Sequence, residues 1–160
     1  LVGVVLTVTG PGASASCMKQ IFQAPPEYLA GETVTFQVGA GTVTPEFELQ
    51  VASPPEISIS TADTVTKGLP LEVSWDSPGA LPTIFVLMLG SERRLECTPS
   101  EGTSLTIPGS LTGLLDGPGT GAFVGGHVSV PGPEVHLSPT FRARGVSVRT
   151  AFHVVPVSPG

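Results

Sequence analysis

Apolar residues alternate with polar or small residues along most of this sequence, and this pattern constrains the fold more than any other feature. In the clearest stretch, 69–76, Leu, Val and Trp alternate with Pro, Glu, Ser and Asp. A period of two places successive side chains on opposite faces of a β-strand. Only 110–115 has leucines at helical spacing, and Gly117 and Pro118 end that pattern after about one turn. The sequence therefore predicts an all-β chain.

The alternating segments divide into two blocks separated by consecutive prolines. The first block, 1–52, is a smaller β-rich N-terminal region with expected strands at 1–8, 32–38 and 46–51. Ser53-Pro54-Pro55 marks the boundary, because prolines stiffen the chain and donate no hydrogen bond to a β-ladder. The second block, 55–157, has expected strands at 57–59, 69–75, 83–89, 94–97, 105–107, 124–130 and 146–154.

The second block has the strand number and spacing of an immunoglobulin-like β-sandwich. Such a domain places about seven short strands in roughly a hundred residues, with turns every 8–12 residues. We expect Trp75 in its core, and we expect the apolar stretch 83–89 to be a central strand covered on both faces. The strands of the first block either complete this sandwich or form a small separate domain. In the last strand, residues 146, 148, 150, 152 and 154 are expected to face inward and residues 147, 149, 151 and 153 outward.

Several short motifs resemble one family. They are Leu69-Pro70-Leu71-Glu72-Val73-Ser74-Trp75, Leu95-Glu96-Cys97, and the segment from Leu105 through Ile107-Pro108 to Leu111; in the first block, Gly31 to Phe36 and Pro45-Glu46-Phe47 also fit. Together they resemble the bacterial immunoglobulin-like or fibronectin-III-like module of exported surface lipoproteins found in gliding and predatory soil bacteria. The resemblance implies a bacterial secreted protein, extracellular or at the cell surface or outer envelope, with a β-sandwich fold. It implies no catalytic or binding residue.

The chain has two cysteines, Cys17 and Cys97. Without histidines at ligand spacing, they cannot form a structural zinc site. They either form one disulfide or remain as two buried thiols. The composition looks extracellular, where disulfides persist, so the bridge is the favoured interpretation. Because Cys17 lies far before Trp75, in the first block, the usual Cys-Trp-Cys pattern of antibody domains is absent and an antibody-type bridge is in doubt.

Charge and hydropathy exclude two classes of partner. The net charge of −6 argues against nucleic acid, whose phosphates require clustered Lys and Arg. Arg142, Arg144 and Arg149 are expected on one solvated strand face. The longest apolar run, 84–89, is far shorter than the roughly 20 residues of a transmembrane helix, so no membrane span is predicted. The apolar opening segment is expected to be a strand rather than the end of a signal peptide.

No catalytic or metal-binding pattern is present, so the sequence predicts a protein without enzymatic activity or cofactor. His127, His136 and His153 have no local metal-ligand spacing, and a surface position explains each of them. Glu46 and Glu48 share an expected strand face, which is ordinary for solvated carboxylates. The single acids Asp76 and Asp116 lie in turns, where Asp is common without calcium.

The remaining signal is a shortage of charge. Only 12% of the residues are charged, against about 25% in typical domains, so strand edges are poorly protected against pairing with another chain. We therefore expect a structural or assembly subunit of a fibre, coat or envelope complex, whose partners are itself or other surface proteins. Its expected inter-subunit strand contains Leu1, Val2, Val4, Leu6 and Val8. The alternative is a monomeric adhesion module that binds a protein or glycan through the loops 76–82 and 115–121.

Overall fold

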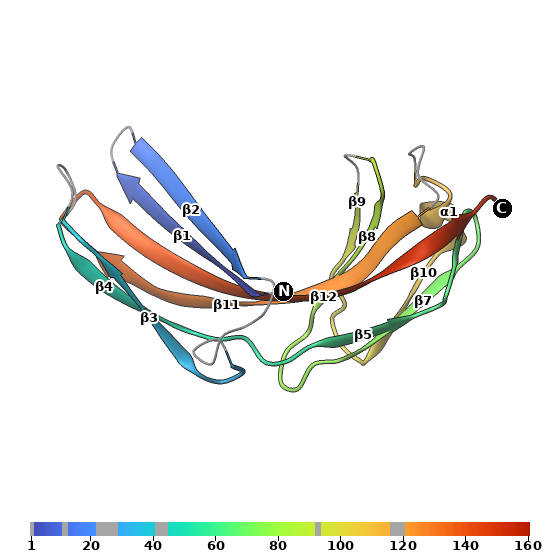
Figure 1. The fold of residues 1–160 in the computed structure, drawn as a ribbon, viewed down its shortest axis with the longest axis horizontal. Coiled ribbons are helices and arrows are strands. Elements are labelled where there is room, and N and C mark those ends of the chain that lie inside the picture. The colour runs from blue at the N-terminus through green and yellow to red at the C-terminus, as the bar shows by residue number, and fades with distance from the viewer. Residues whose placement is uncertain (1, 11–12, 22–28, 41–44, 92–93, 116–120) are drawn as a thin grey trace. The chain divides into compact units, whose positions relative to one another are not determined.

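The computed structural model describes residues 2–10, 13–21, 29–40, 45–91, 94–115 and 121–160, with only the backbone for 2, 4, 5 and 13–21. The described chain is all-β with one helical turn, as the alternation predicted (Figure 1). It groups into two compact units. Unit 1 comprises Leu1–Pro55 and Ser129–Arg149, and unit 2 comprises Glu56–Val128 and Thr150–Gly160. The sequence placed 129–149 in the second block; the domain division itself stays a prediction.

The elements of each unit follow the chain. Unit 1 contains β1 (Val2–Gly10), β2 (Ala13–Ile21), β3 (Thr33–Val38) and β4 (Phe47–Ala52). Unit 2 contains β5 (Ser58–Thr61), β6 (Val65–Thr66), β7 (Leu71–Asp76), β8 (Thr83–Met88), β9 (Arg94–Cys97), β10 (Ser104–Ile107) and α1 (Gly109–Thr112). Two long strands, β11 (Gly121–His136) and β12 (Arg142–Ser158), contribute residues to both units.

In unit 1, the strand order is β2-β1-β12-β11, and β3 and β4 form a separate antiparallel pair. The register pairs Val2 with Arg149 and Thr9 with Arg142 between β1 and β12. Bulky side chains of β4 pack against a row of small residues on β12. A Cβ added to Gly145 would lie 2.6 Å from Leu49 Cδ2 and 2.7 Å from Val51 Cγ2, so only glycine permits this approach.

Polar groups tie the end of β4 to β12. Ser147, 2% exposed, donates its hydroxyl hydrogen bond to the carbonyl oxygen of Ala52. Arg149 Nε donates to the carbonyl oxygen of Pro54 at 3.2 Å, and Arg149 Nη2 donates to Ser53 Oγ at 3.3 Å. Ser53 and Pro54 are buried, so the segment that the sequence marks as a boundary is packed against the unit rather than exposed as a linker.

Two sequence expectations for β12 are therefore wrong. Ser147 and Val155 face a core, whereas Phe152 and Val154 are 44% and 58% exposed, so the expected inward and outward faces are reversed. The reason is that the buried row in unit 1 consists of Ala143, Gly145 and Ser147, which pattern reading takes for a solvent face. The three arginines also do not share one face, because Arg149 bonds the 53–54 segment while Arg142 and Arg144 are exposed.

In unit 2, β12, β11, β8 and β9 are neighbours in that order, β6 pairs with β12 in parallel, and β10-β7-β5 is a three-stranded antiparallel sheet. One core cluster draws on both groups of strands, including Val73 and Ile84, each fully buried, and Trp75, 6% exposed. β7 alternates as expected, with Leu71, Val73 and Trp75 buried, although Leu69 is 56% exposed. No helix among the described residues is long and apolar enough to cross a bilayer.

Candidate functional site

The three histidines lie in separate surroundings. His127 lies beside Phe85, with ring centroids 6.3 Å apart, and His136 Nε2 lies 3.4 Å from Glu134 Oε1. His153 Nε2 bonds the carbonyl oxygen of Ile59 at 2.7 Å, which links β12 to β5 through a contact that no local pattern signals. Among the described side chains, no three His, Cys, Asp or Glu residues are grouped to hold a metal ion.

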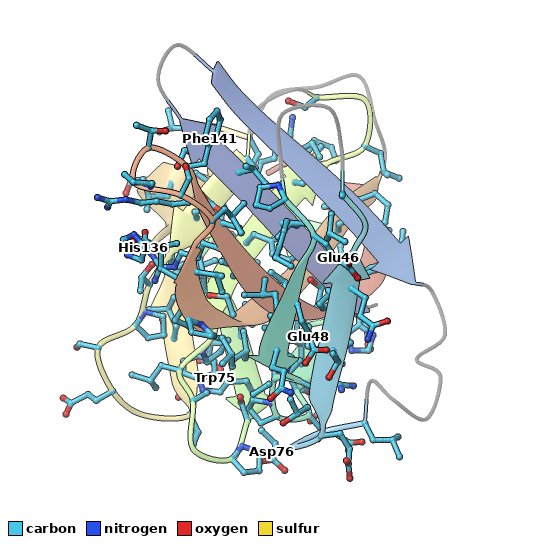
Figure 2. The ribbon with its side chains drawn as sticks, turned by 90° about the vertical axis from the view of Figure 1, so that its left-hand side faces the viewer. Glu46, Glu48, Trp75, Asp76, His136 and Phe141 are labelled. Atoms are coloured by element: carbon cyan, nitrogen blue, oxygen red, sulfur yellow. The ribbon has the colours of Figure 1, made fainter. Side chains whose placement is uncertain are left out.

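The carboxylates singled out by the sequence are exposed (Figure 2). Glu48 accepts hydrogen bonds of 3.4 Å from Gln37 Nε2 and Gln50 Nε2 on the outer side of the β3–β4 pair. Glu46 precedes β4, and Asp76 ends β7. Asp116 lies outside the described residues. Glu48 is thus held by amide groups rather than by a second carboxylate.

The expected disulfide is absent from the structure. Cys97 is a free thiol, and partial burial raises its pKa above the ordinary value. Cys97 lies on β9, which pairs with β8, whereas the backbone of Cys17 lies on β2, which pairs with β1.

The opening strand does not offer the free edge that inter-subunit pairing needs. β1 is hydrogen-bonded to β12 on one side and to β2 on the other. The strand therefore pairs with strands of its own chain on both sides. The residues proposed for pairing, Val2, Val4, Leu6 and Val8, therefore belong to an interior strand, and Leu1 lies outside the described residues. Among the described strands, β2 ends the order in unit 1, so its outer edge replaces β1 as the candidate for strand addition.

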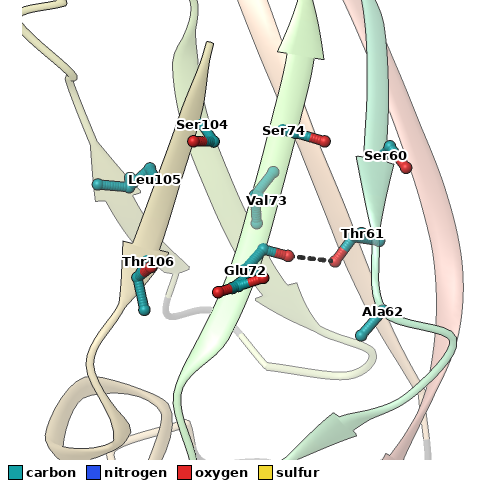
Figure 3. A pocket seen from close by; sticks show the side chains of 9 residues that line it. All are labelled: Ser60, Thr61, Ala62, Glu72, Val73, Ser74, Ser104, Leu105 and Thr106. Carbon is teal, nitrogen blue, oxygen red and sulfur yellow. Dashed lines mark hydrogen bonds between the residues drawn. The ribbon is translucent and has the colours of Figure 1, made fainter. Parts of the chain in front are cut away.

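The outer face of the β10-β7-β5 sheet carries a row of hydroxyl groups (Figure 3). Ser60 pairs with Ser74, and Ser74 pairs with Ser104, so the three serines cross the sheet in one line. A hollow of about 350 Å³ lies over this face. Glu72 is the charged residue of its lining, and Thr61 Oγ1 donates to the Glu72 carbonyl oxygen at 3.4 Å. The face is polar and solvated, with nothing that selects a ligand.

Of the two candidate binding loops, 76–82 is described and 115–121 lies mostly outside the described residues. Residues 76–81 line a hollow of about 420 Å³ together with Trp75, Gly102 and Thr103. A turn closes the loop through the bond from Ala80 N to the Ser77 carbonyl oxygen at 3.3 Å, with Gly79 at φ 75°. Leu81 is 46% exposed there, and the same hollow is lined by Asp76, so the loop offers an apolar side chain and a carboxylate.

An apolar surface on unit 2 is the feature that the sequence analysis missed. We define the phenylalanine face as Phe85, Leu87, Phe123, Phe152 and Val154, from strands β8, β11 and β12. Phe123 pairs with Leu87 across β11 and β8, and the Phe123 ring meets the Phe152 ring edge-on at 5.3 Å. These side chains alternate with core residues such as Val86, Val124 and Val155, so they point away from the core.

A glycine allows the phenylalanines to close over the sheet. A Cβ on Gly125 would lie 2.6 Å from Phe152 Cβ, 2.7 Å from Phe85 Cζ and 2.5 Å from the Ala151 carbonyl oxygen. Phe85 and Phe152 therefore lie over Gly125 from the two strands that flank it. Pattern reading assigned Phe152 to the core, and the signal that could have corrected it is Gly125, a glycine within a valine-rich strand.

Opposite charges border the phenylalanine face on β9. Arg94 pairs with Leu87 and Glu96 pairs with Phe85, so both charged residues lie on the same face as the apolar side chains. Arg94 Nη2 and Glu96 Oε1 are 2.8 Å apart, and both side chains are about half exposed, at 57% and 42%.

No family model matches this chain, and no curated protein matches it.

Proposed function

We propose that this chain is a non-enzymatic structural or assembly module of an extracellular or cell-surface structure, and that it associates with copies of itself through the phenylalanine face. The observation that carries the proposal is that face. Its most exposed members, Phe152 and Val154, are 44% and 58% exposed on a regular β-surface. Contiguous apolar patches on soluble proteins mark interaction sites, because burying them removes apolar area from water.

The border of the face favours a second copy as the occupant. A two-fold interface brings the same patch of both subunits together, so it must be self-complementary. Arg94 and Glu96 carry opposite charges and lie two residues apart on one strand. A two-fold axis that passes between them would place Arg94 of one copy opposite Glu96 of the other. The polar rim would then fix the register, and the phenylalanines would supply the buried area.

The proposal includes the type of module that the sequence resembles. Unit 2 has a three-stranded sheet and a second set of strands that share one core cluster, as expected for an immunoglobulin-like sandwich. The chain is accordingly proposed to be a bacterial exported module of the immunoglobulin-like or fibronectin-III-like kind. Export would keep a free Cys97 in an oxidising environment, where its partial burial slows oxidation.

The test is the oligomeric state of the purified chain by sedimentation velocity and light scattering over a wide concentration range. Phe152→Ser should weaken association by about tenfold or more, because truncated aromatic anchors dominate interface energies. Leu114→Ser is the matched control, since Leu114 is 66% exposed in unit 2 but follows α1 and belongs to none of the strands β8, β11 and β12 that form the face. A wild-type chain that stays monomeric at every concentration would contradict the proposal, as would equal effects of the two substitutions.

Removal of residues 1–8 would not be a suitable test of assembly. Those residues form most of β1, which joins β2 to β12, so truncation would disrupt unit 1 whether or not the chain assembles.

A second candidate function is a monomeric binding module that uses the loop 76–82. It is favoured by the hollow of about 420 Å³ beside Trp75 and Leu81. This function predicts that Leu81→Ser leaves the mass unchanged and weakens binding of a protein or glycan partner. Unchanged binding by that variant would remove the loop from consideration.

A further inference from the structure

Unit 1 has a hollow whose chemical character differs from that of the hollows on unit 2. It measures about 280 Å³ and is lined by residues of β1, β11 and β12, namely Thr7, Thr9, Glu134, Arg142, Ala143, Arg144 and Val146. The register places Thr7 directly opposite Arg144 and Thr9 directly opposite Arg142. Two rows, each with one hydroxyl group and one guanidinium group, therefore lie side by side on this face.

The positive charge in this hollow is only partly compensated. Arg142 Nη1 lies 3.4 Å from Glu134 Oε1, and the same oxygen lies 3.4 Å from His136 Nε2. Arg144 is exposed, and none of the described carboxylates lies within ion-pair distance of it. Side chains two apart on a strand are separated by roughly 6.5–7 Å, so the two guanidinium groups repel each other. This local excess of positive charge occurs in a chain whose net charge is −6.

We propose that this hollow binds an oxyanion-bearing saccharide chain, with Arg142 and Arg144 on a carboxylate or sulfate group and Thr7 and Thr9 on sugar hydroxyls. Guanidinium groups bind planar oxyanions with paired hydrogen bonds, and hydroxyl side chains both donate and accept. The site lies in unit 1 and uses no residue of the phenylalanine face, so binding at this site can be tested independently of the proposed assembly.

The surrounding strands favour a saccharide over an acidic peptide. Extended peptides gain much of their affinity from main-chain hydrogen bonds to an open strand edge. At Arg142 and Arg144, β12 is paired with β1, and β11 is its other neighbour in the sheet. The face therefore offers side chains rather than backbone groups, which suits a ligand that has no peptide backbone of its own.

The experiment measures binding by titration calorimetry at low salt to a sulfated galactan oligosaccharide, an oligogalacturonate, a neutral galactan of equal length and a polyglutamate peptide. We expect one or both acidic saccharides to bind, with affinity that falls as salt rises. Which of the two binds distinguishes sulfate from carboxylate as the source of the oxyanion. Binding of the neutral galactan with equal affinity, stronger binding of polyglutamate, or no binding by either acidic saccharide would overturn the proposal.

Matched variants separate the site from general charge effects. Arg144→Gln should weaken binding by about three- to tenfold, whereas Arg94→Gln, the same charge change in unit 2, should leave it unchanged. Glu134→Gln should strengthen binding by roughly twofold, because Arg142 loses its intramolecular competitor, while Glu96→Gln should not. If the two arginine variants, or the two glutamate variants, behave alike, the binding is nonspecific and the site is refuted.

Discussion

The two units bury different kinds of side chain. Unit 2 fills its core with bulky residues that alternate along β7 and β8, including Trp75, Ile84 and Met88. In unit 1, by contrast, the bulky residues come mainly from β4, and the β12 residues that face them are Ala143, Gly145 and Ser147. Unit 2 is therefore held by apolar volume, whereas unit 1 depends on close backbone approach and on a few polar bonds.

This difference predicts two kinds of sensitivity to mutation. A core of bulky side chains tolerates polar changes at its surface and is damaged by cavities. A contact made over glycine is damaged by added volume, and a buried serine is damaged by loss of its partner.

The largest effect is expected from a cavity in unit 2. Ile84 is fully buried at the centre of the core cluster, so Ile84→Ala should lower the free energy of unfolding by about 3–4 kcal/mol. Urea titration followed by fluorescence of Trp75, the only tryptophan, measures the loss. A loss below about 1 kcal/mol would mean that this core is less tightly packed than the structure indicates.

Added volume in unit 1 should come next. Gly145→Val should destabilise the chain by about 2–3 kcal/mol, because its side chain would occupy the space of Leu49 and Val51. Gly39→Ala is the control, since a Cβ there meets nothing within 4 Å. Hydrogen exchange of the β3 and β4 amides reports the change. Protection that is equal in the two variants would argue against a close β4–β12 contact.

Loss of a polar bond in unit 1 should cost less. Ser147→Ala leaves the carbonyl oxygen of Ala52 without its donor and should cost about 1–2 kcal/mol in denaturant titration. Ser60→Ala, on the exposed hydroxyl face of unit 2, should change stability by less than about 0.5 kcal/mol. Similar costs at the two positions would erase the distinction drawn between the units.

The smallest effect concerns Cys97. Burial disfavours the thiolate and raises the pKa of Cys97 in the folded chain. The contribution of Cys97 to the free energy of unfolding is therefore fully present below the unfolded pKa, and it is lost as pH rises through the folded pKa. In a Cys17→Ser background, native Cys97 should be alkylated more slowly than the urea-unfolded chain at the same mildly alkaline pH, with the rate rising at higher pH. Equal rates would show that the thiol is not shielded.

Sequence reasoning was successful where alternation involves bulky residues. The buried faces of β4 and β7 consist of the predicted residues, because the buried side of each strand is formed by Val, Leu, Phe or Trp side chains. The same reasoning reversed the faces of β12, because small and polar residues form its buried row in unit 1. It also missed β2, Ala13–Ile21, a strand that is defined by its pairing with β1 rather than by a local apolar pattern.

The candidate surfaces were harder to foresee because each depends on register between distant segments. The phenylalanine face requires Phe152 to lie beside Phe123, and the basic hollow requires Thr7 to lie opposite Arg144. Nothing in the local sequence sets those pairings. The loop 76–82 was foreseeable, since its Ser-Pro-Gly turn is readable directly from the residues.

The pairing of β1 with β12 has a consequence for how the chain is made. Val2 pairs with Arg149, so the β1–β2 hairpin lacks its β12 neighbour until the residues up to 149 have been synthesised. Contacts so distant in sequence form slowly, because a long loop must close first. During that interval, β1 exposes an unpaired apolar edge, and the newly made chain is most in need of a chaperone before its last strand arrives.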